Sequence, residues 1–386
     1  MSRKLKPKPK VTVAKRQPPR WQRERNLVLI VWILISLTIA LAVGLVVYWS
    51  VDTYVSVWHK PVAKINDTVL DMNYYVKMLR LYAMNSGQQV DTTTFPYTVL
   101  YDLENSELLR QKATELGIQI TPEEITEKID SYLTDLVGGN STQGNTTQGN
   151  TTQGNTTQGN TTQGNTTQGN TTQPTINLDE TYQQWLTSIR LTDSEYRQVV
   201  ETTLLSDKIL SYLKLTDSEY TQAVDAGTLN DKLVEFLTAH RVPSEAKQVH
   251  LHAIKVDTEE QATQVRERLL GGEDFALVAF ELSQDEESKQ FGGDLGWIPQ
   301  GVLYTEIDDA AFSLPIGNIS QPIETSKGYY VIKVSEINDK MPIAESYRDI
   351  LASNEQKKWL DEQRNASVII DYLDQNKIIW AINRIT

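Results

Sequence analysis

The stretch Gly292-Gly293-Asp294-Leu295-Gly296-Trp297 decides the fold of the second half of this 386-residue chain. About forty residues before it, residues 249–256 alternate apolar and polar side chains, which predicts a β-strand. About thirty residues after it, residues 328–334 predict another strand. The order and spacing of these three blocks are the most informative feature of the sequence.

The segments between the blocks complete an α+β pattern, because capping residues and apolar helical faces alternate with the strands. In chain order, the predicted elements are a helix from Thr258 to Gly271, a helix capped by Asp274, a polar loop over 283–293, a strand at 295–298, a helix around Ile307, and a hairpin of 319–324 and 329–337. We expect a four-stranded antiparallel sheet surrounded by helices.

These blocks resemble the parvulin family (PpiC type, or rotamase) of peptidyl-prolyl cis/trans isomerases, over roughly residues 247–337. The resemblance implies an enzyme that rotates X–Pro bonds of other polypeptides over a barrier of about 18–20 kcal/mol. No bond is made or broken in this reaction, so the resemblance implies no cofactor.

The resemblance also implies four catalytic positions. His252 matches the first family histidine, Asp285 matches a Cys/Asp position that opens the active-site loop, and Thr325 matches a threonine of the last hairpin. In the family, these groups form a hydrogen-bonded network beneath the substrate amide. Tyr330 stands where the second histidine belongs, and a phenol cannot switch between two nitrogens. Val302 replaces a common glutamine, so we expect reduced activity.

A pocket for the proline ring is implied at Leu295, Leu303 and Ile307, with Trp297 as a further substrate-binding candidate. For each of the three aliphatic residues taken alone, an ordinary core position is the better interpretation. The loop from Asp285 holds one lysine among three acids, so we expect no preference for phosphorylated clients.

A zinc site is an alternative use of the histidines, because His250 and His252 share one face of the predicted strand and His240 is close in sequence. No fourth ligand stands at a metal-like spacing, so we expect no metal. The chain has no cysteine, which excludes disulfides, thiol catalysis and Cys-based zinc sites.

Near the N-terminus, Leu27 to Tyr48 is an uncharged run of 22 residues, long enough as a helix to cross a bilayer. Residues 1–25 hold ten Lys and Arg and one acid, although the whole chain has a net charge of −13. This basic tail predicts a cytoplasmic N-terminus and contact with lipid headgroups instead of nucleic acid. Bulky Tyr48 and Trp49 argue against signal-peptide cleavage. We expect a single-pass signal anchor in the cell membrane at residues 26–50, with the rest of the chain extracytoplasmic.

Residues 60–245 predict a helical domain. Thr121-Pro122-Glu123-Glu124 is typical of a helix start, and Leu-Thr-Asp-Ser-Glu-Tyr does the same at 191–196 and 215–220. Seven Asn-Thr-Thr-Gln-Gly-like repeats fill residues 140–174 without a charged or apolar side chain, which predicts a flexible, disordered insert at 138–175. An aggregation-prone Gln/Asn tract is the alternative, but glycine at every fifth residue argues against it.

Outside the insert, the segments 62–66, 108–118 and 121–124 resemble the N-terminal domain of SurA-like and PrsA-like foldases. The resemblance implies a domain that cradles unfolded client segments. It also implies that a helix within residues 344–372 packs back onto that domain.

We therefore expect five parts. They are a basic cytoplasmic tail (1–25), a transmembrane anchor (26–50), a SurA/PrsA-like helical domain (60–245), a parvulin-type domain (246–338) and a C-terminal helical segment that packs on the helical domain (339–386). The expected function is a membrane-anchored foldase that isomerises X–Pro bonds in unfolded or secreted proteins. The alternative is a holdase chaperone with a weak or inactive parvulin domain, which Tyr330 favours. Client identity and homodimer formation are left open by the sequence.

Overall fold

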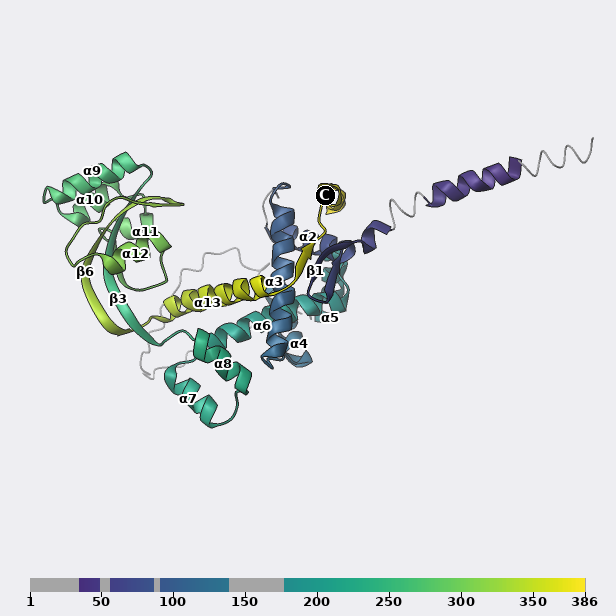
Figure 1. Cartoon of the computed structure of the whole chain (residues 1–386), viewed down its shortest axis with the longest axis horizontal. Helices are drawn as coiled ribbons and strands as arrows, with labels where there is room; N and C mark the ends of the chain where they lie inside the picture. Colours follow the sequence, from purple (N-terminus) through teal and green to yellow (C-terminus); the bar gives the residue numbers. More distant parts are fainter. Residues whose placement is uncertain (1–34, 49–55, 87–90, 139–176, 386) are drawn as a thin grey trace, which may run out of the picture.

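The computed structural model describes residues 35–48, 56–86, 91–138 and 177–385. Within these ranges the protein is α+β. We call residues 56–240 together with 343–385 the helical domain, and residues 245–342 the sheet domain. Figure 1 shows the sheet domain at one end, with the long helix α13 running from its base into the helical domain.

Most of the helical domain precedes the sheet domain in the chain, and its last elements follow it. Its elements are η2 (Ser56–His59), β1 (Pro61–Ile65), β2 (Thr68–Asp71), α2 (Met72–Ser86), α3 (Phe95–Glu115), α4 (Pro122–Gly138), α5 (Leu178–Ile189), α6 (Asp193–Leu213), α7 (Asp217–Asp225), α8 (Asp231–His240), α13 (Glu345–Ala366), β7 (Ile369–Asp371) and α14 (Gln375–Ile385). One core, with Tyr75, Leu79 and Leu108 fully buried, lies among α2, α3 and their neighbours.

The helix starts confirm the caps predicted from the sequence. Thr192 and Thr216 begin α6 and α7 with complete capping boxes, in which each hydroxyl accepts from a glutamate N–H three residues later. At α4, the N–H of Glu124 donates to the hydroxyl of Thr121 at 3.2 Å, and the N–H of Thr121 donates to Glu124 Oε2 at 2.6 Å. These bonds satisfy first-turn N–H groups that have no partner within a helix.

A small sheet in the helical domain was not predicted. β1 lies between β2 and β7 and is antiparallel to both. Asn66 turns the β1–β2 hairpin with φ 52°, and its Oδ1 accepts from the N–H of Val368 at 3.0 Å. The strands have five, four and three residues, too few for an alternating pattern to be visible in the sequence.

The sheet domain confirms the predicted four-stranded antiparallel sheet, in the order β4-β3-β6-β5. Its elements are β3 (Glu245–Val256), α9 (Glu259–Leu270), α10 (Phe275–Leu282), α11 (Glu286–Lys289), β4 (Asp294–Pro299), α12 (Thr305–Ser313), β5 (Ile323–Thr325) and β6 (Gly328–Pro342). Its two faces carry separate cores. Ile254 and Val331 pack with α9 and α10, and Leu251 and Ile332 pack with α12.

The long strands β3 and β6 connect the sheet domain to α8 and α13 (Figure 1). α13 contributes Ala352 and Trp359 to a second core of the helical domain, together with residues of α3, α6 and α8. The Trp359 ring lies 5.0 Å from that of Phe236 in α8. The end of the chain thus packs against elements that precede the sheet domain.

Residues 35–48, the later part of the expected membrane span, are helical, and residues 27–34 lie outside the described residues. Across the described ranges, no helix combines the length and the apolar character needed to cross a bilayer. The basic tail and almost all of the repeat insert also lie outside the described residues.

Candidate active site

The glycine-rich motif forms an irregular start to the edge strand β4. Gly293, with φ 78°, accepts a hydrogen bond from the N–H of Ala253 on β3 at 2.8 Å. A Cβ on Gly293 would lie 2.6 Å from the carbonyl oxygen of Ala253, so only glycine allows this close approach. The motif therefore fixes how closely β4 approaches β3.

A bulge in β4 then determines the face of the sheet on which each side chain of the motif lies. Gly296, with φ 72°, pairs with Leu251, whereas Asp294 pairs with His252, so Leu295 is an extra residue between the two pairs. A bulge of this kind breaks the strict alternation of a strand. Leu295 packs in the core on the α12 side, whereas Asp294 lies with His252.

His252 lies on the face of the sheet that α10 covers. Its half-buried ring stands 5.8 Å from that of Phe275, the first residue of α10, at 62°. Burial lowers the pKa of His252, and this outweighs the opposite effect of Asp294. The imidazole is therefore neutral at neutral pH.

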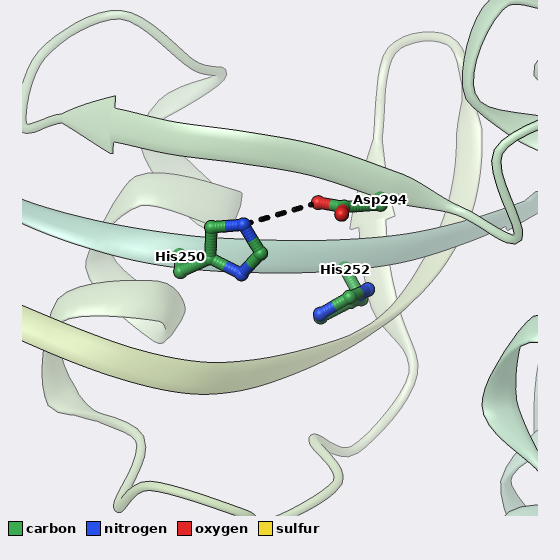
Figure 2. A group of neighbouring side chains, drawn as sticks. All are labelled: His250, His252 and Asp294. Carbon is green, nitrogen blue, oxygen red and sulfur yellow. Dashed lines mark ion pairs between the residues drawn. The ribbon is translucent and has the colours of Figure 1, made fainter.

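His250, His252 and Asp294 form a cluster in which one nitrogen or oxygen atom of each lies within 4.8 Å of those of the other two (Figure 2). His250 Nε2 stands 3.5 Å from Asp294 Oδ1, and His250 Nδ1 stands 2.7 Å from the hydroxyl of Ser335. Among the residues that the structure describes, this is the group with the composition and spacing to hold a metal ion. His240 lies elsewhere, with its Nδ1 2.8 Å from Glu355 Oε1.

Asp285 lies at the start of α11, in a loop tied to the end of β3. Its Oδ2 accepts from the hydroxyl of Ser288 at 2.6 Å, and its N–H donates to Ser283 Oγ at 3.3 Å. Ser283 Oγ also accepts from the N–H of Lys255 at 3.3 Å. These bonds hold the Asp285 carboxylate beside the end of β3.

Tyr330 lies on the opposite face of the sheet from His252. It pairs with Lys255 of β3 and packs with the core on the α12 side. Burial raises the pKa of Tyr330, with smaller contributions from Tyr304 and the negative charge of Asp285. The phenol therefore stays protonated and able to donate a hydrogen bond.

Thr325 closes the β5–β6 hairpin. Its hydroxyl donates to the carbonyl of Gly328 at 2.8 Å and accepts from the N–H of Lys327 at 3.1 Å. Within the described residues, no hydrogen bond joins His252 to Asp285, Thr325 or Tyr330. The single network that the resemblance implies therefore stays a prediction.

The candidate pocket residues fall into two places. Leu295 and Leu303 are half-buried around Ile307, which is 3% exposed, on the same face as Tyr330. The Trp297 ring instead lies edge-on to that of His250 of the other face, with ring centroids 5.4 Å apart. Leu295, Leu303 and Ile307 thus lie together in the core beside Tyr330, with Trp297 outside this group.

Residues 245–336 match the family model described as the PPIC-type PPIASE domain. The sheet domain is a parvulin-type isomerase domain. A second family model, the SurA-like N-terminal domain, matches residues 20–134. The chain thus joins a parvulin-type domain to a SurA-like N-terminal domain.

Curated relatives of the chain are named foldase protein PrsA. The foldase protein PrsA of Geobacillus sp. (strain WCH70) is 37% identical over 125 residues, which are 32% of this chain and 45% of the relative. That of Caldanaerobacter subterraneus subsp. tengcongensis is 47% identical over 87 residues, 22% of this chain and 28% of the relative. The chain thus matches less than half of the length of these relatives.

Among solved structures, the parvulin NmPin of Nitrosopumilus maritimus is 34% identical, covering 24% of this chain and 98% of that one, with a TM-score of 0.23.

Sequence reasoning found His250 and His252 on one face but missed Asp294 and Ser335 as their neighbours. Asp294 reaches the histidines through the β4 bulge, and Ser335 lies at a register shift of β6 against β3. The only signal in the sequence was the third glycine of the motif, Gly296, which marks where a bulge can form.

Proposed function

We propose that the chain is a membrane-anchored, extracytoplasmic foldase that catalyses cis/trans isomerisation of X–Pro bonds in unfolded or secreted polypeptides. The observation that carries the proposal is the match of residues 245–336 to the PPIC-type domain, on a four-stranded antiparallel sheet. The foldase names of the relatives support polypeptide clients.

The proposed reaction needs a surface that prefers the twisted amide over both planar forms. In our proposal the proline ring lies against Leu295 and Leu303, with Ile307 beneath them. Tyr330 donates a hydrogen bond to the substrate amide, and Asp285 beside it orients the phenol. Water is excluded by the apolar surface, which strengthens such a bond.

We assign supporting roles to the other two candidates. Thr325 fixes the turn that precedes Tyr330 in β6, so its effect on catalysis acts through the position of the phenol. His252, on the far face of β3, acts on the pocket through the position of this central strand.

The test is the rate of cis/trans isomerisation of an unphosphorylated proline tetrapeptide by the full chain. We expect acceleration that His252→Ala reduces about tenfold, or about 1.4 kcal/mol in the barrier, because the variant loses the contact with Phe275 that helps to position β3. Tyr330→His is expected to raise the rate, because it restores the residue of the family. Tyr97→His, an exposed tyrosine of the helical domain, is the matched control.

Absence of acceleration by both the wild type and Tyr330→His would refute the isomerase proposal. A rate that Tyr330→His leaves unchanged would refute the reason we give for reduced activity.

A second function, holding unfolded clients, is favoured by a cleft in the helical domain. The cleft has a volume of about 300 Å³, and its walls come from α2, α3 and α6. They include Tyr74, Met78, Tyr82, Leu103 and Val199. The lining also holds Ser106 and polar residues of α6, and such a mixture of aromatic, aliphatic and hydroxyl groups suits an extended peptide without sequence preference.

The holdase function is tested by the aggregation of a denatured client at equal concentrations of wild type and Val199→Glu. A charge in the cleft is expected to weaken the suppression of aggregation and to leave the isomerisation rate unchanged. Glu201→Lys, on the same helix but outside the cleft lining, is the control. Equal suppression by all three proteins would remove the cleft as the client site.

The membrane anchor is proposed for residues 26–50, from the uncharged run of 22 residues and the ten preceding cations. We expect the chain to stay with membranes on alkaline extraction, and protease added outside the cell to reach the helical domain. Recovery of the chain in the soluble fraction would refute the anchor. Retention by the membrane with the helical domain protected would refute the orientation.

A further inference from the structure

Three potential metal ligands converge on one face of the sheet, where β3 pairs with β4 (Figure 2). His250 and His252 come from β3, and Asp294 comes from the neighbouring strand β4. Two imidazoles and one carboxylate are a common ligand set for zinc and similar ions. All three residues lie on paired strands, and the bulge at Leu295 places Asp294 beside the two histidines.

The spacing suits a single small ion. Ligand atoms bound to one zinc ion at about 2.0–2.1 Å stand roughly 3.3 Å apart in a tetrahedral site. His250 Nε2 and Asp294 Oδ1 are 3.5 Å apart, and the third ligand atom lies within 4.8 Å of both. A small rotation of the side chains therefore brings the three ligand atoms to the separation that a single bound ion requires.

The surroundings already orient two of the ligands. Ser335 Oγ donates to the carbonyl of His250 at 3.2 Å, so it accepts from His250 Nδ1–H at 2.7 Å. This leaves the lone pair on Nε2, which faces Asp294. The N–H of Gly296 donates to Asp294 Oδ1 at 2.8 Å and holds the carboxylate in place. A bond to the second nitrogen of a ligating histidine, such as that of Ser335 to His250 Nδ1, is typical of protein metal sites.

An ion can reach the cluster from solvent. The side chain of Asp294 is 39% accessible and that of His250 is 23% accessible. Three protein ligands leave one position of a tetrahedral ion open to water.

We propose that His250, His252 and Asp294 bind a divalent transition-metal ion of the zinc class, with Ser335 as the residue that orients His250. The site goes beyond the proposed isomerisation, which requires no metal. An ion bound here engages the imidazole of His252, and so removes it from any other role.

The test measures binding of Zn²⁺ to the full chain by competition with a coloured chelator, and the visible spectrum after addition of Co²⁺. Wild type is expected to bind one ion at the site and to give the intense visible bands of four-coordinate Co²⁺. His250→Gln is expected to weaken Zn²⁺ binding at least about a hundredfold. Ser335→Ala is expected to weaken it about 10–100-fold, as loss of an orienting bond does elsewhere.

His59→Gln is the control, because His59 is an exposed histidine outside the cluster. It is expected to bind Zn²⁺ as the wild type does. Asp294→Asn is a further ligand variant for the case that His250→Gln does not fold, as judged by its thermal unfolding without metal. Equal Zn²⁺ affinity in wild type and the folded cluster variants would overturn the proposal. So would the absence of binding to the wild type at 0.1 mM Zn²⁺.

Discussion

Two successive tyrosines of β6 face opposite sides of the sheet, and this sets how the candidate residues can cooperate. Tyr329 packs with the α9–α10 core and Tyr330 packs with the α12 core. His252 is on the Tyr329 side, in contact with Phe275. An interaction of His252 with Tyr330 must therefore pass through the sheet.

A double-mutant cycle on isomerisation tests this separation. We predict that the effects of His252→Ala and Tyr330→Phe add in free energy, to within about 0.5 kcal/mol, because residues without shared contacts are usually additive. The rates of the wild type, both single variants and the double variant supply the four values. A coupling energy of about 1 kcal/mol or more would instead indicate the shared network that the family resemblance implies.

Gly293 is predicted to be required for the stability of the isomerase domain. Gly293→Ala places a methyl group 2.6 Å from the carbonyl oxygen of Ala253 and keeps a residue with a side chain at φ 78°. We expect a loss of about 2–4 kcal/mol in the free energy of unfolding, measured by urea denaturation.

Gly272→Ala is the matched control, because Gly272 has φ 92° but no atom within 4 Å of an added Cβ. It is expected to cost about 1 kcal/mol, the strain of the backbone alone. Equal losses of unfolding free energy in the two variants would show that the close approach of β4 to β3 adds nothing to the cost of the Gly293 substitution.

At the same scale, alternation along 249–256 was enough to place His250 and His252 on one face. It was not enough to place Asp294, because a single extra residue, Leu295, changes which face the rest of β4 presents. Whether Tyr330 lies on the same face of the sheet as His252 also depends on the register of β3 against β6. The two residues are more than seventy positions apart in the chain. Pairing between distant strands is not encoded in local patterns.

At the scale of elements, the helix starts were the most predictable part of the fold. The Thr192 and Thr216 boxes depend only on residues within one turn, so the sequence contains the whole interaction. β7 is the opposite case, since it pairs with β1 about three hundred residues earlier. Its three residues have no local property that distinguishes them from a loop.

The attachment of α13 and β7 to α3 is predicted to depend on pH through Glu104. Glu104 of α3 is 1% exposed, and it accepts a hydrogen bond from Arg364 of α13. Burial, together with the nearby carboxyl of Asp371, raises the pKa of Glu104 to about 7, although Arg364 acts in the opposite direction. The folded protein therefore holds a proton on Glu104 more tightly than the unfolded chain does.

A raised carboxyl pKa contributes stability that is complete below about pH 4.5 and is lost as the pH rises through about 7. We expect the free energy of unfolding to fall between pH 5 and pH 8 by on the order of 1–3 kcal/mol from this group. Urea denaturation at several pH values measures it. Glu104→Gln is expected to reduce the fall in the free energy of unfolding with pH. Glu115→Gln, a surface change on the same helix, is expected to leave it unchanged. A slope that is identical in wild type and Glu104→Gln would contradict the prediction.

At the scale of the whole molecule, the helical domain is assembled from segments on both sides of the isomerase domain. α13 fills a core with Ala113, Leu237 and other residues of the first segment, and β7 completes a sheet begun by β1. The isomerase domain is thus inserted into the helical domain through β3 and β6. The chain leaves the helical domain through β3 and returns through β6, and these two strands are antiparallel neighbours. The isomerase domain can therefore be inserted at this point without disturbing either core of the helical domain.

The repeat insert is a second insertion into the same domain. It joins α4, which ends at Gly138, to α5, which begins at Leu178. The two helices pack directly on each other, with the rings of Tyr132 and Trp185 5.7 Å apart. Asn177 caps α5 from its own side chain, so the start of this helix needs no residue of the repeats.

We therefore predict that replacing residues 140–174 by a short Gly-Ser linker leaves both cores intact. Shortening the connection lowers the entropic cost of closing it, by about 0.6 kcal/mol for each halving of the length. The free energy of unfolding is expected to stay equal or to rise by about 1 kcal/mol, and the isomerisation rate to stay unchanged. A Gly-Ser linker of the original length separates the effect of length from that of composition. Loss of stability in the short-linker chain alone would mean that α4 and α5 need the longer span. Loss in both variants would mean that the Asn-Thr-Thr-Gln-Gly repeats themselves contribute to the fold.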